Sequence, residues 1–386
     1  MGPTVKLFYE DAGIREFDAV VLSCVPEKEG HKAVLDRTAF FPEGGGQYGD
    51  IGWIDGILVA DTKEKSGVIY HYLEKPLKPG TKVHGKLDWA LRFERMQQHS
   101  AEHVVSGIVH RRFGYDNVGF HLGADYCTMD FNGPLSGKQL KEIEEEANRV
   151  VFAGLPVCVR YPEKEELEHM EYRSKIEIKG QVRIVEIPGV DACACCAPHV
   201  ESTGQIGLIK LVDMSSYKGG ERISLLSGIR ALRDYQCKQE QAKRIGNMLC
   251  EKGEKLAEAV ERLKQDGIRL KSEIAGLKSQ ILKKRAMETN VSEKTTIVFE
   301  EDLAGDEARE YMNLLLEQGA EVCAVFTGTE DTGYRYVIGS RTKDARVFHQ
   351  ILKENFGARG GGKPEMVQGS LTGARVKITD KLKALP

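Results

Sequence analysis

The sequence predicts an α+β fold built from several domains, and three observations support this prediction. The chain has 386 residues, which is long enough for two or three separate hydrophobic cores. Its apolar pattern changes from short alternating runs to a helical period near Leu91, and then to a seven-residue repeat from about residue 230. Strand and helix patterns alternate after that repeat. We therefore expect four parts, at residues 1–90, 91–229, 230–288 and 289–386.

The composition is that of a globular protein. Hydrophobic residues make up 41% and charged residues 29% of the chain. No run of about 18 apolar residues occurs, and the first residues lack the form of a signal peptide. These features predict a cytoplasmic protein without a membrane partner.

Residues 1–90 are expected to form a β-rich, barrel-like domain. Short runs such as 82–89 alternate apolar and polar residues and are separated by Pro and Gly. The segment 40–47 interrupts these runs with Gly44, Gly45 and Gly46, which allow the backbone to approach a ligand closely. A glycine triplet alone also fits an ordinary turn.

Residues 91–229 are expected to form an α+β domain. One amphipathic helix begins near Leu91 and a second covers 140–152, with strands near 157–160 and 182–187. The segment 195–199 then falls in a loop after a strand. A helix and a loop should therefore converge in this domain.

Four residues on that helix and loop predict a zinc site. His99 and His103 are four apart, so a helix places both rings on one face, and Cys195 and His199 supply two more ligands of the type that Zn²⁺ prefers. The histidine pair alone also fits a buried, hydrogen-bonded pair. Ser100 stands where a zinc protease carries its catalytic glutamate, which argues against that class.

The nine cysteines show no disulfide framework. Three of them crowd into 193–196, beside the predicted ligands. The other six are scattered singly and are expected to be small buried apolar residues: Cys24, Cys127, Cys158, Cys237, Cys250 and Cys323.

Residues 230–288 carry a heptad repeat, which predicts a coiled coil or a helical hairpin. Leucines recur at 249, 256, 263, 270 and 277, whereas glycines 246, 253 and 267 fall on the other core position and weaken a long zipper. A hairpin arm and a dimer contact both remain open.

Two segments of the chain are basic although the rest is acidic. Residues 230–288 contain 15 basic and 9 acidic residues, and residues 341–386 contain 10 basic and 4 acidic residues. Both segments are therefore suited to phosphate binding.

Residues 289–386 are expected to form an α/β domain. Strands are predicted at 296–299 and 322–326, with helices at 307–318 and 347–356. The segment 360–369, rich in glycine, closes the domain.

Five ordered motifs resemble the alanyl-tRNA editing family, which hydrolyses mischarged tRNA. They are Thr38 to Gly49 with Gly-Gly-Gly-Gln, His99-x-x-x-His103, residues 182–186 leading to Cys195-x-x-x-His199, residues 203–207, and Gly219-x-x-Arg222-Ile223 ending at Gly228. The last 100 residues resemble the DHH-associated domain of alanyl-tRNA synthetases. Phosphoesterases that share this domain need an Asp-His-His motif, which the chain lacks.

The resemblance implies a zinc-dependent deacylase that holds one Zn²⁺ and hydrolyses tRNA(Ala) mischarged with serine or glycine. Because too few residues precede His99 for an aminoacylation domain, we expect no aminoacylation activity. The resemblance also implies two sets of binding residues. The substrate would contact Thr38, Gly45, Gly46 and Gln47, and tRNA would contact Arg359, Gly361, Gly362, Lys363, Arg375 and Lys377. A homodimer through the helical segment or the C-terminal domain is a further expectation.

Two departures from the family pattern affect substrate contacts. Residues 196–198 read Cys-Ala-Pro where the synthetases carry Gly-Gly-Thr, and Glu221 precedes Arg222 where a neutral or basic residue is typical. Three other functions stay open: a tRNA-binding protein with a closed structural zinc site, a deacylase for another mischarged tRNA, and redox sensing through Cys193, Cys195 and Cys196.

Overall fold

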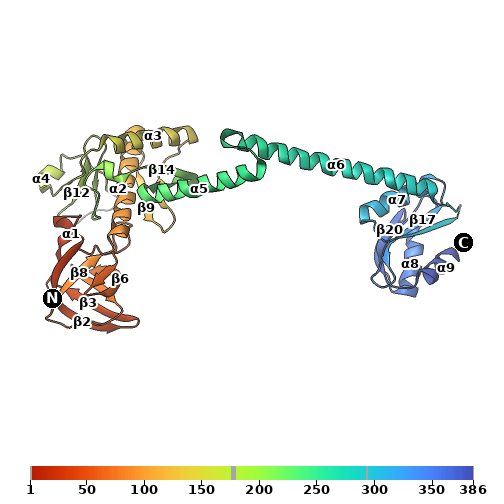
Figure 1. Ribbon diagram of the computed structural model, residues 1–386, viewed down its shortest axis with the longest axis horizontal. Coiled ribbons are helices and arrows are strands. Elements are labelled where there is room, and N and C mark those ends of the chain that lie inside the picture. Colours follow the sequence, from red (N-terminus) through yellow and green to blue (C-terminus); the bar gives the residue numbers. More distant parts are fainter. Residues whose placement is uncertain (1, 175–179, 293, 386) are drawn as a thin grey trace. The chain divides into compact units, whose positions relative to one another are not determined.

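The computed structural model describes residues 2–174, 180–292 and 294–385 (Figure 1). The chain separates into two compact units, Met1–Arg244 and Ile245–Pro386. Both contain helices and sheets, so the mixed α/β composition with several sheets agrees with the sequence prediction. Among the described helices, none is both long and apolar enough to span a bilayer. The finer division into four parts stays a prediction.

The N-terminal strands form a ring of hydrogen-bonded neighbours. Six strands pair in the order β2-β3-β7-β6-β5-β8, and β8 closes the ring on β2. In β8 every second residue is buried, which is the burial pattern of a strand with one face on a core. The elements of this region are β1 (Val5–Lys6), α1 (Leu7–Glu10), β2 (Glu16–Glu27), β3 (Gly30–Leu35), β4 (Arg37–Thr38), β5 (Gly52–Ile54), β6 (Ile57–Lys65), β7 (Val68–Leu73) and β8 (Lys82–Leu87).

The rest of this unit is built around one long helix, α2 (Trp89–Phe113). A four-stranded sheet in the order β14-β15-β10-β9 packs on α2, and α3 (Gly137–Ala153) packs beside it. Ser136 and Gln139 form a capping box that fixes the start of α3. The strands are β9 (Asn117–Leu122), β10 (Cys127–Phe131), β14 (Ile209–Tyr217) and β15 (Gly220–Ser227).

A small sheet carries the second predicted motif. Its three strands are β11 (Cys158–Arg160), β12 (Ile184–Ile187) and β13 (Asp191–Ala194), and the short helices α4 (Lys164–Leu167) and η1 (Thr203–Ile206) flank it. The first two strands match the predicted ones. The sequence prediction omitted β13 because its four residues, one of them charged, give too short a pattern.

The segment 230–288 is helical but not continuous. It contains α5 (Gly228–Leu249), the single turn η2 (Gly253–Lys255) and α6 (Leu256–Glu288). Cys250 and Gly253 have φ angles of +54° and +59°, which interrupt the helix between them. The heptad repeat therefore does not run through one helix from 249 to 281.

The C-terminal unit contains a five-stranded sheet in the order β16-β17-β18-β20-β19. Only the β16–β17 pair is parallel. Helix α7 packs on one face, whereas α8 and α9 pack on the other. The elements are β16 (Thr295–Glu300), α7 (Gly305–Glu317), β17 (Val322–Thr329), β18 (Gly333–Ser340), α8 (Ala345–Phe356), β19 (Arg359–Lys363), β20 (Met366–Leu371) and α9 (Arg375–Lys383).

The prediction that all six scattered cysteines are small buried residues is wrong for three of them. Cys127 and Cys323 are buried and Cys24 is half-buried, whereas Cys158, Cys237 and Cys250 are exposed. Cys158 lies on the outer strand of the small sheet, and the other two lie on or after α5. A single cysteine in a sequence does not indicate whether its position is exposed or lies in the core.

Candidate metal centre

The two histidines of the first motif lie where α2 crosses the protein interior. Asp88 caps the start of this helix by accepting a hydrogen bond from the Leu91 amide, and every residue from 96 to 109 is buried. The ring centroids of His99 and His103 are 5.6 Å apart. Both rings therefore lie on one face of the helix, as the four-residue spacing predicts.

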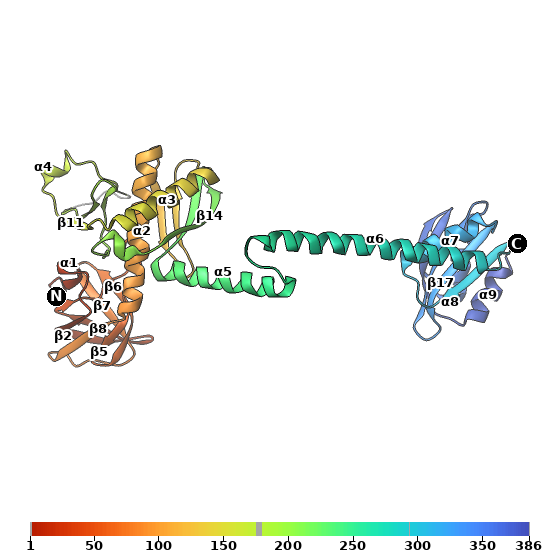
Figure 2. The same cartoon turned by 45° about the horizontal axis from the view of Figure 1, so that its top comes forward.

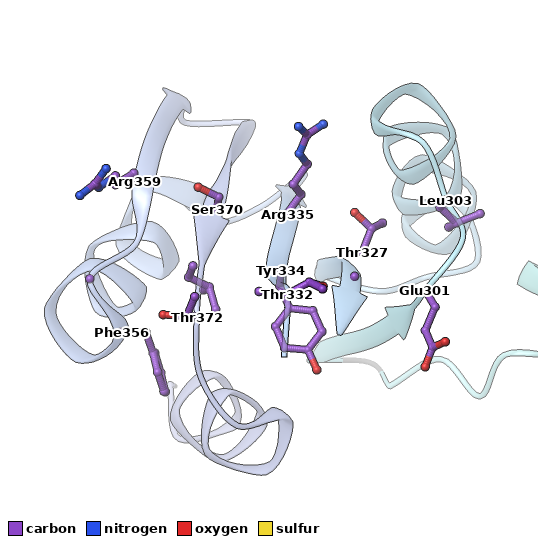
Figure 3. Close-up of a pocket in the computed structure, with 14 residues that line it drawn as sticks. Glu301, Leu303, Thr327, Thr332, Tyr334, Arg335, Phe356, Arg359, Ser370 and Thr372 are labelled. Carbon is purple, nitrogen blue, oxygen red and sulfur yellow. The ribbon is translucent and has the colours of Figure 1, made fainter. Parts of the chain in front are cut away.

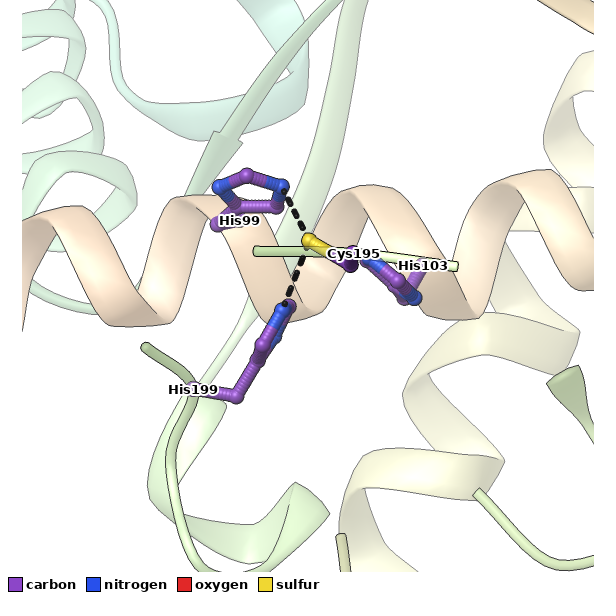
Figure 4. Close-up of side chains that lie close together, drawn as sticks. All are labelled: His99, His103, Cys195 and His199. Atoms are coloured by element: carbon purple, nitrogen blue, oxygen red, sulfur yellow. Dashed lines mark hydrogen bonds between the residues drawn. The ribbon is translucent and has the colours of Figure 1, made fainter. Parts of the chain in front are cut away.

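The second motif brings a thiol and a third imidazole to the same place (Figure 4). Cys195 and His199 lie in the loop that follows β13. The Cys195 sulfur is 3.5 Å from His99 Nε2 and 3.4 Å from His199 Nε2. All four candidate ligand atoms lie within 4.8 Å of one another. A tetrahedral site with Zn–N near 2.05 Å and Zn–S near 2.3 Å needs sulfur–nitrogen separations of about 3.6 Å, so this donor set fits zinc.

The ring nitrogen of each histidine that faces away from the cluster has a polar partner. His99 Nδ1 lies 3.2 Å from Gln47 Oε1, His103 Nδ1 lies 3.0 Å from Asp191 Oδ2, and His199 Nδ1 lies 3.0 Å from Ser100 Oγ. Such partners fix the tautomer and the orientation of a metal-ligating histidine. The three imidazoles are therefore held with Nε2 toward the common centre.

Asp191 is the charged member of this outer layer. Arg173 donates two hydrogen bonds to its carboxylate, at 2.7 and 2.8 Å, and His103 contacts the same carboxylate. Burial opposes the charge, but the bonds from His103 and Arg173 outweigh it and lower the pKa of Asp191. His103, Asp191 and Cys193 form a second group that can hold a metal ion. Because Asp191 is already bound to Arg173, we interpret this group as support for the first site.

Burial also sets the protonation of the ligands themselves. It lowers the pKa of His199 well below the usual value, and His103 and His99 lower it further. It raises the pKa of the Cys195 thiol, as do Cys196 and Cys193. The imidazole is thus neutral and ready to bind, whereas the thiol must lose a proton when a metal binds.

A cavity of about 800 Å³ opens beside the cluster, which is a typical volume for a small-ligand site. Three of the four candidate ligand residues line it, His99, His103 and Cys195. Its wall also includes Gly45, Gly46, Glu102, Phe120 and Arg183. A metal held by the cluster would therefore be open to a ligand on one side.

Two glycines in this wall are required by the backbone. Gly45 and Gly46 have φ angles of +61° and +80°. A Cβ atom on Gly46 would lie 2.8 Å from the carbonyl oxygen of Phe120, and one on Gly45 would lie 3.2 Å from the Cys196 sulfur. The glycine triplet thus lets the loop between β4 and β5 pass close to the cluster.

Glu102 is a cavity residue to which the sequence assigned no function. Its side chain is buried, and Oε1 accepts hydrogen bonds from Asn117 Nδ2 at 2.6 Å and Ser106 Oγ at 2.8 Å. Its Oε2 lies 3.7 Å from His103 Nε2. A fixed carboxylate therefore stands in the cavity next to the candidate metal. In the sequence, the position of Glu102 directly before His103 was the feature that could have indicated a role at this site.

The other two predicted substrate residues, Thr38 and Gln47, are buried. The Thr38 hydroxyl is 2.9 Å from His71 Nε2 and accepts a bond from the Phe40 amide at 3.1 Å. Gln47 holds His99, and its buried amide nitrogen has no hydrogen-bond partner among the described residues. Neither Thr38 nor Gln47 lines the cavity. Their contact with substrate stays a prediction.

The C-terminal sheet carries a row of polar side chains across the adjacent strands β17, β18, β20 and β19, and Figure 3 shows these side chains. Thr327, Arg335, Ser370 and Arg359 are paired in register, so they project from the same face. They line a polar cleft of about 750 Å³. Gly361 and Lys363 follow Arg359 at alternate positions of β19 and share its face. Arg335 was absent from the sequence prediction because only the register brings it beside Arg359.

The three remaining predicted tRNA residues do not share this face: Gly362 lies between Gly361 and Lys363 on β19 and faces the other side of the sheet, and two residues follow β20. Arg375 and Lys377 belong to α9, which packs with Tyr334 and Tyr336 on the opposite face of the sheet. The Arg375 guanidinium lies 4.8 Å from the centre of the Phe299 ring. The structure therefore brings Arg359, Gly361 and Lys363 together but places Arg375 and Lys377 apart from them.

Two family models match parts of the chain. Residues 182–224 match the threonyl and alanyl tRNA synthetase second additional domain, and residues 9–91 match the class II (A) tRNA synthetases. The first match contains Cys195 and His199. The second falls on the N-terminal strands.

Similar proteins carry names related to alanyl-tRNA. The chain is 36% identical over 250 residues to alanyl-tRNA editing protein AlaX-L of Pyrococcus horikoshii, covering 60% of this chain and 61% of that protein. It is 31% identical over 261 residues to alanyl-tRNA editing protein Aarsd1 of Rattus norvegicus, covering 63% of each. It is 35% identical over 268 residues to alanine–tRNA ligase of Pyrococcus furiosus, covering 66% of this chain and 29% of the ligase. The chain thus spans less than two thirds of each of these relatives, and the resemblance predicted from its motifs is confirmed.

Proposed function

We propose that this chain is a trans-editing aminoacyl-tRNA deacylase, which hydrolyses the ester of mischarged tRNA(Ala) and does not aminoacylate tRNA. The observation that carries this proposal is a zinc-type ligand cluster open to a cavity, in a chain similar to alanyl-tRNA editing proteins. Seryl-tRNA(Ala) is the expected substrate, with glycyl-tRNA(Ala) as a second one. The four-part domain division and the cytoplasmic location belong to the same proposal.

One Zn²⁺ per chain would be held by His99, His103, Cys195 and His199. When bound, it supplies a Lewis acid that can polarise an ester carbonyl or water. Other residues of the chain hold these ligands in position. Arg183 donates hydrogen bonds to the carbonyl oxygens of Cys195 and Ala197, at 2.8 and 3.0 Å, and so fixes the loop that carries the sulfur ligand.

We further infer that Glu102 binds the α-ammonium group of the aminoacyl ester. This carboxylate is buried in the cavity wall, and Asn117 and Ser106 hold it in place. A charge-assisted hydrogen bond to an ammonium group contributes more than a neutral one, and burial strengthens it. The bond would orient the ester toward the neighbouring cluster.

Selection of serine against alanine needs a polar partner for one extra hydroxyl group. The Gln47 amide nitrogen, which has no partner among the described residues, supports Gln47 as a donor. Gly45 and Gly46 would shape the pocket through their close backbone approach. Thr38 stays in the proposal through its family position, although His71 and Phe40 already engage its hydroxyl.

Residues of the C-terminal unit would bind the phosphates of the mischarged tRNA. The exposed cations Arg359 and Lys363, with Gly361 and Gly362 between them, form the proposed binding strand, and Arg335 extends it. Arg375 and Lys377 would contact a different part of the same tRNA. Such contacts weaken as salt increases.

The runner-up function, a tRNA-binding protein with a structural zinc site, requires a closed ligand set. The exposure of three ligands to the cavity favours the deacylase instead. The deciding experiment follows release of serine from seryl-tRNA(Ala) and of alanine from alanyl-tRNA(Ala), with and without a zinc chelator. We expect chelator-sensitive release of serine alone. Binding of both tRNAs without hydrolysis would support the runner-up, and hydrolysis of another mischarged tRNA alone would change the substrate.

A further inference from the structure

One cation in the cavity wall is buried without a counter-charge among the described residues. Arg183, which directly precedes β12, is 9% exposed and lines the cavity beside the candidate metal cluster. Its guanidinium group forms no ion pair with any carboxylate that the structure describes. Burial of an unpaired charge costs free energy, and buried charges are therefore usually paired. An anion that enters the cavity would supply the missing partner.

The guanidinium group of Arg183 has unused hydrogen-bond donors. Its Nη1 donates to the carbonyl oxygens of Cys195 and Ala197, and these two bonds fix the side chain. Its Nε is buried and has no partner, and its Nη2 donates no hydrogen bond to the part of the chain that the structure describes. Nε and Nη2 lie on the same side of a guanidinium group and can bind two oxygens of one anion. Arg173 uses this same pair of nitrogens to hold the carboxylate of Asp191.

Aromatic side chains surround this cation. The Tyr9 ring of α1 lies over the guanidinium group, with 5.1 Å between the ring centre and Cζ of Arg183. Figures 1 and 2 show α1 between the N-terminal strands and the small sheet, and α1 packs on the loop that carries the sulfur ligand. Tyr9, Phe120 and Tyr161 line the same cavity as the cation. Aromatic rings beside a cationic group are the combination that binds the bases and phosphates of single-stranded nucleic acid.

We propose that Arg183 binds the phosphate group that joins the terminal adenosine of the tRNA to the preceding nucleotide. This assignment rests on the proposed deacylase function and adds a phosphate contact inside the editing cavity. A guanidinium group can bind a phosphate through two hydrogen bonds, and the negative charge of the phosphate would compensate the buried cation.

The assignment distributes three groups of the substrate over the cavity wall. The α-ammonium group would bind Glu102 on α2, and the ester would lie at the metal cluster. The phosphate would bind Arg183, which is held by the loop that carries Cys195. The volume of about 800 Å³ is in the range of sites that enclose a small ligand, so it suits one aminoacylated nucleotide.

Binding of adenosine 5′-monophosphate and of adenosine to the full chain tests the proposal without hydrolysis. Isothermal titration calorimetry of the wild-type chain should show roughly 10- to 150-fold tighter binding of the monophosphate, the factor for a hydrogen bond to a charged group. Arg183→Gln should remove this preference. Arg160→Gln should keep it, because Arg160 lies on the adjacent strand β11 but does not line the cavity.

Three results of these titrations would overturn the proposal. The first is equal affinity of the wild-type chain for both ligands, including no measurable binding of either. The second is an unchanged preference for the monophosphate in Arg183→Gln. The third is binding of free serine that depends on Arg183 without a preference for the monophosphate, because the cation would then bind the carboxylate of the released amino acid.

Hydrolysis of two small esters separates phosphate binding from the support that Arg183 gives to the loop of Cys195. Seryl-adenosine lacks the phosphate, and its 5′-monophosphate carries it. Arg183→Gln should lower kcat/KM for the phosphorylated ester to the value for seryl-adenosine, and Arg183→Lys, which keeps the charge, should retain part of the difference. Equal slowing on both esters would show a structural role alone and overturn the proposal. If the wild-type chain hydrolyses neither ester but prefers the monophosphate in titrations, the proposed function fails and the phosphate site stands.

Discussion

Replacement of Glu102 by glutamine tests the inferred recognition of the substrate amino group. The amide keeps the shape of the side chain and can still accept the hydrogen bonds from Asn117 and Ser106, but it loses the negative charge. A hydrogen bond to a charged group contributes about 1.5–3 kcal/mol, which corresponds to a factor of roughly 10 to 150. We expect kcat/KM for the seryl ester to fall by that factor.

The assay compares two substrates and two variants. Seryl-tRNA(Ala) carries a free α-ammonium group, and N-acetylseryl-tRNA(Ala) does not, so Glu102→Gln should slow the first and leave the second unchanged. Glu94→Gln serves as control, because Glu94 lies on the same helix but binds Arg230 and does not line this cavity. Zinc content must be measured as well, since Glu102 lies near His103. Equal rates for wild type and Glu102→Gln, or equal slowing on both substrates, would refute the inference.

Four other predictions concern the metal ligands, the serine pocket, the tRNA interface and a buried histidine. Cys195→Ser should lower zinc content and abolish hydrolysis, whereas Cys196→Ser should retain zinc; equal zinc content in the two variants, measured by elemental analysis, would contradict the ligand assignment. Thr38→Val should reduce the ratio of seryl to alanyl ester hydrolysis, and an unchanged ratio would remove Thr38 from the pocket. Arg335→Ala should weaken tRNA binding and reduce the slope of log K against log salt by about 1, as measured by filter binding; an unchanged slope would remove Arg335 from the interface. Burial lowers the pKa of His71 to about 4, so the unfolded chain takes up the proton first as pH falls below its value of about 6.5. The free energy of unfolding should decrease by up to about 3 kcal/mol between pH 6.5 and 4, and a His71→Asn variant with the same pH dependence in urea titrations would contradict this.

The candidate ligands could be predicted from the sequence because each pair is local. The spacing of His99 and His103 fixes their relation on a helix, and Cys195 and His199 are joined by one short loop. The layer behind them could not be predicted. Asp191 reaches His103 across 88 residues, so only the tertiary packing of β13 against α2 brings the two together.

The C-terminal unit shows the same division between local and tertiary information. Arg359 and Lys363 were predicted from their Gly-rich segment, whereas Arg335 joins them only through the register of β18 with β20. Arg375 and Lys377 are close in sequence to this segment but lie on a helix that packs on the other face. Likewise, the heptad pattern predicted helices at 230–288 but not the interruption at residues 250–255, where Cys250 takes a positive φ that only a few non-glycine residues adopt.

The most direct test of the central claim is the rate of serine release from seryl-tRNA(Ala) as zinc is titrated into the metal-free full chain. The rate should rise in proportion to added zinc and level off at one Zn²⁺ per chain, while alanyl-tRNA(Ala) stays intact throughout. Full activity without metal, or stoichiometric zinc binding without serine release, would contradict the assignment of this cluster and its cavity as a zinc-dependent editing site.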